Sequence, residues 1–360
     1  MKKFCFHLPN KESINIKKTI LMAIPIVAVV FSVIGCALYQ REEQEQPKVI
    51  RIGITMYNEY DPFTEEIRHN IEENLIQYGK EKGIEVNSTV VYSGKNQLVQ
   101  NDQVDDFIAN NYDVICVNLV DRTDPYVIIE KAKSADVPII FFNRELVPDD
   151  INRFDKLYYV GAKPEVSGQL QGQIVLDALK ERFEEIDVNQ DGVIQYVLLE
   201  GEAGHQDAII RSRVSVETIL RGGVEMEMLG DEIANWDRNQ AQTKIKSLLA
   251  GYPRQIELIL ANDDNMALGA LDALTDFGVQ NMPMIVGVNG QKEALEDIDK
   301  GLIEGTALNN AKEKGRIIAK LAIGLGQTGQ VPNDIKLEGG KYYYVPYERI
   351  DKDNVEYYLK

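Results

Sequence analysis

Short apolar runs alternate with amphipathic stretches from residue 49 onward, and this alternation constrains the fold more than any other feature. Runs typical of buried strands occupy residues 49–55, 84–91, 114–119 and 137–142, and helical patterns lie between them. Because these strands are almost continuously apolar, helices must cover both of their faces. The order βαβαβαβ therefore predicts a doubly wound parallel sheet.

The same alternation begins again after Tyr158-Tyr159-Val160. A helical pattern at 165–183 is followed by strand-like runs at 194–199, 224–229, 256–261, 284–288 and 305–308. A chain of 360 residues is long for a single domain, so two units in series suit its length. We expect an α/β protein with two Rossmann-like lobes.

The first 36 residues carry a targeting pattern. Lysines precede residues 19–35, which hold no charge, as in a signal peptide. The stretch ends in Val33-Ile34-Gly35-Cys36, which is similar to the lipobox of bacterial lipoproteins, whose cysteine is acylated; an uncleaved signal anchor is the alternative. Either interpretation places the remaining chain outside the membrane, and the polar residues 37–48 predict a tether.

Composition excludes several classes of function. A formal net charge of −18 argues against nucleic-acid phosphates as partners and suits a soluble, monomeric protein outside the cell. The three cysteines, Cys5, Cys36 and Cys116, form neither a disulfide framework nor a C-x-x-C pair, and Cys116 is interpreted as a buried thiol. The chain has no Gly-rich phosphate loop after its first strand and no Walker lysine.

One stretch has the spacing of a calcium-binding loop. Oxygen-bearing side chains stand at loop positions 1, 3, 5 and 9, a backbone carbonyl at 7 and glycine at 6: Asp187, Asn189, Asp191, Gln195, Val193 and Gly192. Position 12, where an EF-hand has a bidentate Glu, is Leu198, and the residues after the loop predict a strand. The loop therefore needs a carboxylate from elsewhere, and an Asx-rich turn without metal is the alternative.

Polar and aromatic side chains gather just after the predicted strands, where ligands bind in open parallel sheets. They are Asp61, Phe63, Asn143, His205, Asp207, Arg211, Trp236, Asp263, Asn289 and Asn309. Planar polar groups bond neighbouring hydroxyls, and aromatic faces cover the C–H faces of a pyranose, so this set suits a neutral polyol. Several alternatives stay open: Asp61 before Pro62, like Asp207 and Asp263, could simply cap a helix, His205 could lie on the surface, and Trp236 could belong to the core.

Several segments resemble the galactose/glucose-binding proteins of bacterial ABC importers, which are calcium-containing members of the type I periplasmic binding protein family. The resemblance runs from about residue 50 to the end of the chain. It is carried by Arg51-Ile52-Gly53-Ile54-Thr55, Phe141-Phe142-Asn143, Tyr158-Tyr159-Val160-Gly161, Gly204-His205-Gln206-Asp207 and Gly305-Thr306-Ala307-Leu308-Asn309. It implies two lobes joined by three crossover strands, with residues 49–160 and 310–343 in the first lobe and 161–309 and 344–360 in the second.

The resemblance also implies roles for individual residues. The ten strand-end residues would bind the sugar, with Phe63 and Trp236 on the two faces of the pyranose. Glu257 would supply the missing bidentate carboxylate of a structural calcium site. This chain has Asp263 where the family has Asn, and Asn289 where it has Asp. Donor and acceptor roles are thereby exchanged, which leaves the identity of the sugar open.

The function implied is a lipid-anchored protein that captures galactose, glucose or a related sugar by hinge closure and delivers it to an ABC permease and its ATPase. It would catalyse nothing itself. A sensor that presents the sugar-bound state to a chemoreceptor or a histidine kinase stays open. The enzymatic alternative is a glycosidase that uses Asp61 and Asp207 as paired carboxylates. A sugar-responsive repressor does not fit the N-terminal export signal or the negative charge.

Overall fold

The computed structural model describes residues 49–360. The predicted signal peptide, Cys36 and the tether of residues 37–48 lie outside the described residues. Within residues 49–360, none of the helices combines the length and the apolar character needed to cross a membrane.

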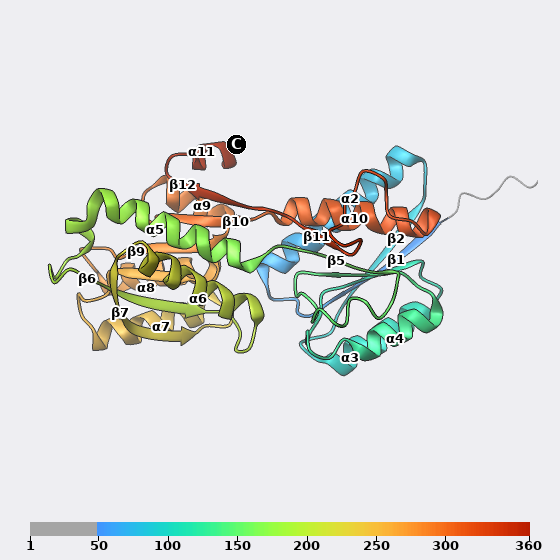
Figure 1. The fold of residues 1–360 in the computed structure, drawn as a ribbon, viewed down its shortest axis with the longest axis horizontal. Coiled ribbons are helices and arrows are strands. Elements are labelled where there is room, and N and C mark those ends of the chain that lie inside the picture. Colours follow the sequence, from blue (N-terminus) through green and yellow to red (C-terminus); the bar gives the residue numbers. More distant parts are fainter. Residues whose placement is uncertain (1–48) are drawn as a thin grey trace, which may run out of the picture. The chain divides into compact units, whose positions relative to one another are not determined.

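The first lobe is built on a six-stranded sheet with the order β11-β5-β4-β3-β1-β2. Its strands are β1 (Ile50–Met56), β2 (Val86–Tyr92), β3 (Val114–Val117), β4 (Ile139–Phe142), β5 (Leu157–Gly161) and β11 (Tyr342–Tyr344). All neighbouring strands in this sheet are parallel. Its helices are α2 (Pro62–Lys82), α3 (Gln97–Ala109), α4 (Tyr126–Ala135) and α10 (Ala311–Thr328), as Figure 1 shows.

The second lobe repeats this plan, with the order β12-β10-β9-β8-β6-β7. Its strands are β6 (Val193–Glu200), β7 (Glu225–Ile233), β8 (Leu258–Ala261), β9 (Met284–Asn289), β10 (Gly305–Asn309) and β12 (Tyr347–Asp351). Its helices are α5 (Pro164–Ile186), α6 (Gln206–Arg221), α7 (Arg238–Gly251), α8 (Asp264–Phe277), α9 (Lys292–Asp299) and α11 (Val355–Tyr358). The prediction of two α/β lobes with parallel sheets is confirmed, except that β12 runs antiparallel to β10.

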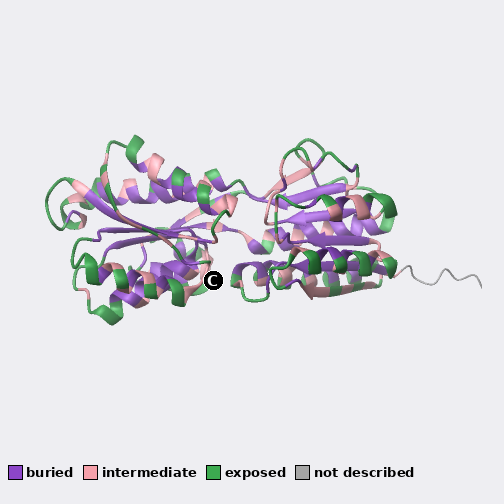
Figure 2. Ribbon diagram, turned by 90° about the horizontal axis from the view of Figure 1, so that it is seen from below, coloured by how far each residue is buried: buried purple, intermediate pink, exposed green. Residues whose placement is uncertain are grey.

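Apolar side chains fill both faces of the sheets, as the continuous apolar runs predict. In the first lobe, Ile52 and Ile54 of β1 pack in one cluster with residues of α2 and α10, whereas Ile115 and Phe141 pack in another with α3 and α4. Figure 2 shows the strands buried between helices whose outer faces are exposed. Cys116 is 0% exposed, and burial raises its thiol pKa to about 12, so its interpretation as a buried thiol is confirmed.

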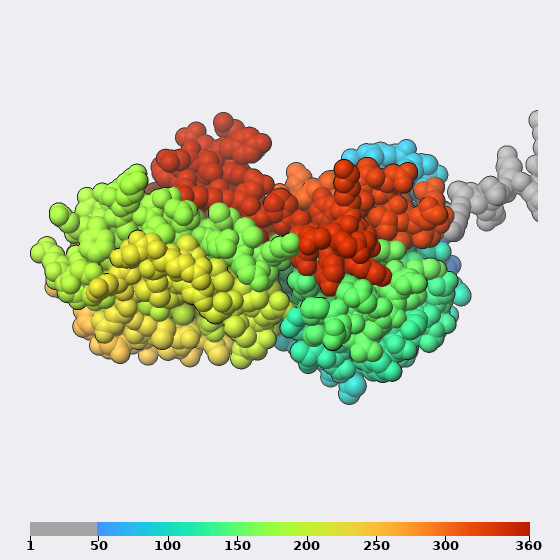
Figure 3. Space-filling model, viewed as in Figure 1, coloured from blue at the N-terminus to red at the C-terminus, as the bar shows by residue number. Residues whose placement is uncertain are grey.

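The chain passes between the lobes three times: from β5 to α5, from β10 to α10 and from β11 to β12. Figure 3 shows the last of these segments, in red, on the surface of both lobes. The first and third crossings run side by side, since the Val345 amide donates to the Gly161 carbonyl at 2.8 Å. Connections of this kind allow two lobes to rotate about a hinge.

Candidate functional site

A pocket between the lobes brings together nine of the ten strand-end residues. Its cavity volume in this structure is about 30 Å³. Its lining consists of Asp61, Phe63, Asn143, His205, Asp207, Arg211, Trp236, Asp263 and Asn289, together with Tyr57 and Arg144. The tenth residue, Asn309, lies directly behind this lining, because its Nδ2 donates to the Asn289 Oδ1 at 3.3 Å.

Three lining residues hold backbone conformations that side chains rarely adopt. The φ angles of Asn143, Trp236 and Asn289 are 65°, 62° and 114°. Such conformations cost about 1–3 kcal/mol each and persist where the surrounding structure enforces them, which is often at functional sites. Trp236 also lies so close to Gly201 that a Cβ at position 201 would stand 2.0 Å from the indole ring. The fold therefore positions this ring at the pocket, although it also packs against the core of the second lobe.

Asp61 both caps a helix and faces the pocket, so the two interpretations of this residue are compatible. Its Oδ1 accepts from the amides of Phe63 and Thr64 at 3.0 and 3.2 Å, at the start of α2. Its Oδ2 accepts from the Tyr57 hydroxyl at 2.6 Å. Because a carboxylate oxygen has two acceptor positions, Oδ2 keeps one for a ligand, whereas both positions of Oδ1 are used by the amides. Burial raises the pKa of Asp61, while the Tyr57 hydroxyl and the two amides oppose this shift.

His205 is held as a neutral imidazole with its proton on Nε2. Its Nδ1 accepts from the Asp207 amide at 3.2 Å, at the start of α6, which leaves Nε2–H as the donor. Burial and the positive charges of Arg144 and Arg211 hold the pKa of His205 well below its usual range. The ring packs edge-on against Trp236 with 5.1 Å between the centroids. His205 can therefore donate one hydrogen bond to a neutral ligand.

Arg211 is 4% exposed and is fixed from several directions. It donates to the Ser167 hydroxyl, the Asn262 carbonyl and the Tyr347 hydroxyl at 3.1, 3.0 and 2.8 Å. A longer contact of 3.5 Å joins it to Asp207. A guanidinium has five N–H groups. The described residues bond four of those in Arg211, so at least one stays available to a ligand.

Asp263 retains its proton near neutral pH. It is 3% exposed, and its Oδ1 accepts from the Met266 amide at 2.8 Å, at the start of α8. Burial raises its pKa to about 8; the Met266 amide opposes the shift, and the charges of Asp61 and Asp264 add to it. A protonated carboxyl keeps both a donor and an acceptor, although a side-chain amide has two N–H donors. Asp263 can therefore replace an Asn at this position without losing the donor.

Asp264 fixes the segment that carries Asn289, and sequence reasoning missed it. Its Oδ2 accepts from the amides of Gly290 and Gln291 at 2.7 and 2.8 Å, and its Oδ1 accepts from the Thr306 hydroxyl at 2.7 Å. These bonds tie the start of α8 to the segment that follows β9 and to the start of β10. The only sequence signal for this role was its place beside Asp263 at a strand end.

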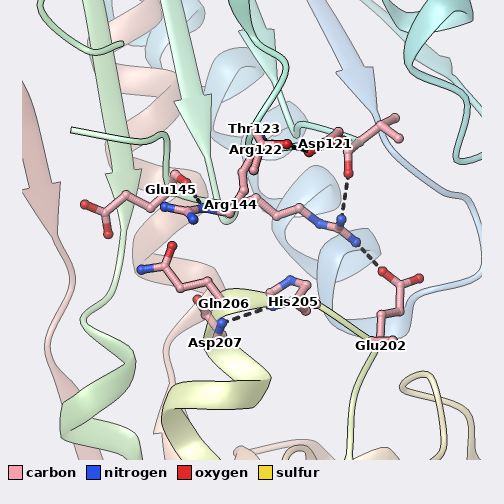
Figure 4. A pocket seen from close by; sticks show the side chains of 12 residues that line it. Asp121, Arg122, Thr123, Arg144, Glu145, Glu202, His205, Gln206 and Asp207 are labelled. Carbon is pink, nitrogen blue, oxygen red and sulfur yellow. Dashed lines mark hydrogen bonds and ion pairs between the residues drawn. The ribbon is translucent and has the colours of Figure 1, made fainter. Parts of the chain in front are cut away.

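A second pocket, which shares Arg144, His205 and Asp207 with the first, is lined by charged residues that sequence reasoning also missed. Arg144 donates to Glu202 at 2.6 Å, and its guanidinium lies 4.2 Å from the centroid of the Tyr57 ring. Figure 4 shows Arg144 reaching from one lobe to Glu202 on the other. The Arg144 Nε is buried without a partner among the described residues. Arg144 and Tyr57 stand at strand ends, close in sequence to Asn143 and Asp61. That position is the sequence signal that could have identified them.

The predicted calcium ligands lie together at the start of β6. Glu257 reaches the loop as the resemblance implies, since its carboxylate accepts from the Val188 and Gln195 amides at 2.7 and 3.0 Å. Asn189 donates to Asp191 and to Gln195, each at 2.9 Å. In this arrangement the oxygen ligands are bonded to N–H groups, and no cluster of three or more acidic, His or Cys side chains within residues 49–360 is arranged to hold a metal ion.

The chemistry of this donor set nevertheless fits a calcium ion. The loop supplies two carboxylates, two side-chain amides and the carbonyl of Val193, and Glu257 adds a third carboxylate. Ca²⁺ prefers six to eight oxygen ligands. Rotation of the Asn189 and Gln195 amides by half a turn would present oxygen in place of nitrogen. Gly192 has a φ of 81°, so the turn at loop position 6 does use the freedom of glycine.

Comparisons with known proteins cover both lobes. The family described as periplasmic binding protein domain matches residues 52–330. The D-galactose/methyl-galactoside binding periplasmic protein of Haemophilus influenzae is 36% identical over 86% of this chain and 92% of its own length. A xylitol-binding protein of Mycolicibacterium smegmatis is 28% identical over 85% of this chain and 78% of its own length.

Solved structures show the same fold. An ABC transporter solute binding protein from Bacillus halodurans with bound myo-inositol has a TM-score of 0.73 at 25% identity, covering 88% of this chain and 99% of its own. A periplasmic solute binding protein from Actinobacillus succinogenes with bound D-allose has a TM-score of 0.72 at 22% identity, covering 86% of this chain and 100% of its own.

Proposed function

Since this chain belongs to the periplasmic binding protein family, we propose that it is the extracytoplasmic binding component of an ABC importer and captures galactose, glucose or a related monosaccharide. The observation that carries the proposal is the pocket itself. It brings together nine residues that the sequence predicted to bind a polyol, and they come from both lobes. Galactose is the first ligand to test, because the relative at 36% identity is named for D-galactose and methyl-galactoside.

The chemistry of the pocket supports a neutral sugar. Asp61 and Asp207 accept from hydroxyls, and Arg211 and the Nε2–H of His205 donate to them. The aromatic rings of Phe63 and Trp236 would cover the apolar faces of a pyranose. Formal charges in the lining nearly balance, so a neutral ligand adds no unpaired charge.

Capture follows from the placement of these groups on two lobes. Sugar would enter while the lobes are apart and would be bonded from both sides when they rotate together about the three crossings. Only the closed state offers all the contacts at once, so bound sugar favours closure. The closed form would then deliver the sugar to a permease, whose ATPase supplies the energy. A sensor that reports the closed form to a chemoreceptor or histidine kinase would use the same step, and loss of sugar uptake on deletion would separate the two.

The proposal includes no catalysis by this chain. Three carboxyl groups lie in the pocket: Asp61 is held by Tyr57 and two amides, Asp207 lies beside Arg211, and Asp263 accepts from the Met266 amide. Calorimetry against galactose, glucose, xylose, arabinose and ribose tests the function. We expect one sugar bound per chain and no hydrolysis of an aryl galactoside. Hydrolysis, or no binding of any of these sugars, would contradict the proposal.

Two further parts of the proposal concern the metal and the anchor. Asp187, Asn189, Asp191, Val193, Gln195 and Glu257 would hold a structural calcium ion, which would tie the loop to the segment before β8. Family membership indicates an extracytoplasmic location. Acylation of Cys36 would attach the monomeric protein to the membrane, and metabolic labelling with a palmitate analogue, lost in Cys36→Ala, tests the anchor.

A further inference from the structure

Lys314 is a buried cation without a partner. It lies in the first turn of α10 and is 2% exposed. Among the described residues, its ammonium forms neither a hydrogen bond nor an ion pair; its one close contact is the Phe63 ring, whose centroid lies 5.1 Å from Nζ. Burial of a charge costs several kcal/mol unless hydrogen bonds or an opposite charge offset it.

The fold does not explain a lysine at this position. A cation in the first turn of a helix opposes the helix dipole, which favours anions there. The cap of α10 is already supplied by Asn310, whose Oδ1 accepts from the Glu313 amide at 2.9 Å. A methionine or leucine would fill the same buried space without the cost of burying a charge.

The ring contact and the electrostatic neighbours of Lys314 belong to the candidate sugar site. Phe63, Asp207 and Arg211, which line the pocket, are its ring contact and its electrostatic neighbours. Burial lowers the Lys314 pKa to about 7, the Asp207 charge opposes this shift, and Arg211 adds to it. Asn309, at the end of the preceding strand, has a buried Oδ1 that no described group bonds. A donor and an acceptor without a hydrogen-bond partner among the described residues, Lys314 Nζ and Asn309 Oδ1, therefore lie next to residues that line the pocket.

We propose that Lys314 is a further sugar-contacting residue that determines specificity, its ammonium donating to an oxygen of the sugar at the end held by Asp207 and Arg211. This inference rests on the proposed sugar-binding function. An oxygen of the bound sugar then accepts the hydrogen bond that no described residue accepts from the ammonium. The free-energy cost of burying this charge is therefore offset only by a ligand that places an oxygen there.

Calorimetry on the full-length protein with D-galactose tests the inference. Lys314→Met keeps the length of the side chain and removes the donor, Lys314→Gln keeps a neutral donor, and Lys312→Met alters an exposed lysine on the same helix. We expect Lys314→Met to weaken galactose binding about 10- to 100-fold, the range for a hydrogen bond to a charged group. Lys314→Gln should lose less, and Lys312→Met nothing. The sugar-free melting temperature of Lys314→Met should stay the same or rise.

A set of monodeoxy galactoses identifies the contact. One analogue should bind the wild type weakly and should lose nothing further in Lys314→Met, because both changes remove the same hydrogen bond. Equal loss for every analogue would mean that Lys314 only shapes the pocket, and wild-type affinity in Lys314→Met would mean that it has no role; either overturns the inference. This pattern decides the matter even if Lys314→Met lowers the melting temperature. If the wild type bound no monosaccharide, the proposed function itself would fail.

Discussion

Arg144 donates to the Glu202 carboxylate at 2.6 Å, and this bond joins the segment after β4 in one lobe to the segment after β6 in the other. Lys95 of the first lobe pairs with the same carboxylate. Burial alone would raise the pKa of Glu202, but Arg144 and Lys95 hold it below its usual range. Glu202 is thus an anion between two cations of the opposite lobe, and the contact exists only while the lobes are together.

Loss of this bridge should weaken sugar binding, although Glu202 does not line the sugar pocket. Glu202→Gln removes the charge that holds the lobes together, so the closed state becomes less populated and the apparent affinity falls in proportion. We expect a loss of about 5- to 30-fold by calorimetry, equivalent to roughly 1–2 kcal/mol. Glu217→Gln is the control, because Glu217 pairs only with arginines of its own helix. An equal effect of the two substitutions would contradict the bridge.

Arg211 should be irreplaceable by lysine. The guanidinium serves the Ser167 and Tyr347 hydroxyls and the Asn262 carbonyl at once, which a single ammonium cannot reproduce. Arg211→Lys should weaken galactose binding about 100-fold or more and should lower the melting temperature, since buried acceptors lose their donors. Arg213→Lys, on the exposed face of the same helix, should change neither quantity. Full affinity in Arg211→Lys would remove Arg211 from the site.

Asp263 should make stability fall as pH rises. Its folded-state pKa of about 8 lies above the value of about 3.9 for an unfolded Asp, so between these values the native state keeps a proton that the unfolded state releases. The contribution of Asp263 therefore lowers the free energy of unfolding progressively from about pH 4 to pH 8. Asp263→Asn removes this loss, and its melting temperature should exceed that of the wild type increasingly across this range.

The control for this experiment is Asp102→Asn, which changes an exposed carboxylate on α3. Thermal unfolding at pH 5, 6.5 and 8 gives the comparison. Galactose affinity at pH 6.5 should change little in Asp263→Asn, because the amide and the protonated carboxyl both donate. A difference in melting temperature that is constant with pH would show that Asp263 does not titrate in this range.

Calcium removal should affect stability more than sugar binding. The ion would offset the repulsion among Asp187, Asp191 and Glu257, which lie in one lobe and outside the sugar pocket. Chelation should lower the melting temperature by about 5 °C or more, with galactose affinity changed less than about threefold, and Glu257→Gln should abolish the chelator effect. An unchanged melting temperature after verified removal of calcium would rule out the structural role.

The sequence predicted the fold because its signals are local. Each apolar run could be assigned to a strand without knowledge of the others, and Pro62 and Gly83 stand at the two ends of α2. The three-residue strand β11 was missed, since its tyrosines are only half-buried and form one edge of the sheet. The antiparallel pairing of β12 was missed for the same reason: the partner of an edge strand depends on tertiary structure.

The site was predictable where position in the strand pattern was sufficient. Asp61, Asn143 and Asp263 lie in the segments that follow β1, β4 and β8, and the rule for open parallel sheets selects them. The roles of Glu202 and Lys314 could not be predicted. The role of Glu202 depends on its partners in the other lobe, and that of Lys314 on the lack of a hydrogen-bond or ion-pair partner among the described residues. Charge burial and pairing are properties of the folded chain, and no spacing in the sequence encodes them.

The most direct test of sugar binding uses the single tryptophan of the chain. Trp236 lines the pocket, so its fluorescence reports on that site and on no other. Titration with D-galactose should change the emission saturably, with one sugar bound per chain, and Arg211→Ala should remove the change. Unaltered emission with galactose, glucose, xylose, arabinose and ribose would contradict the assignment of this pocket as a sugar site.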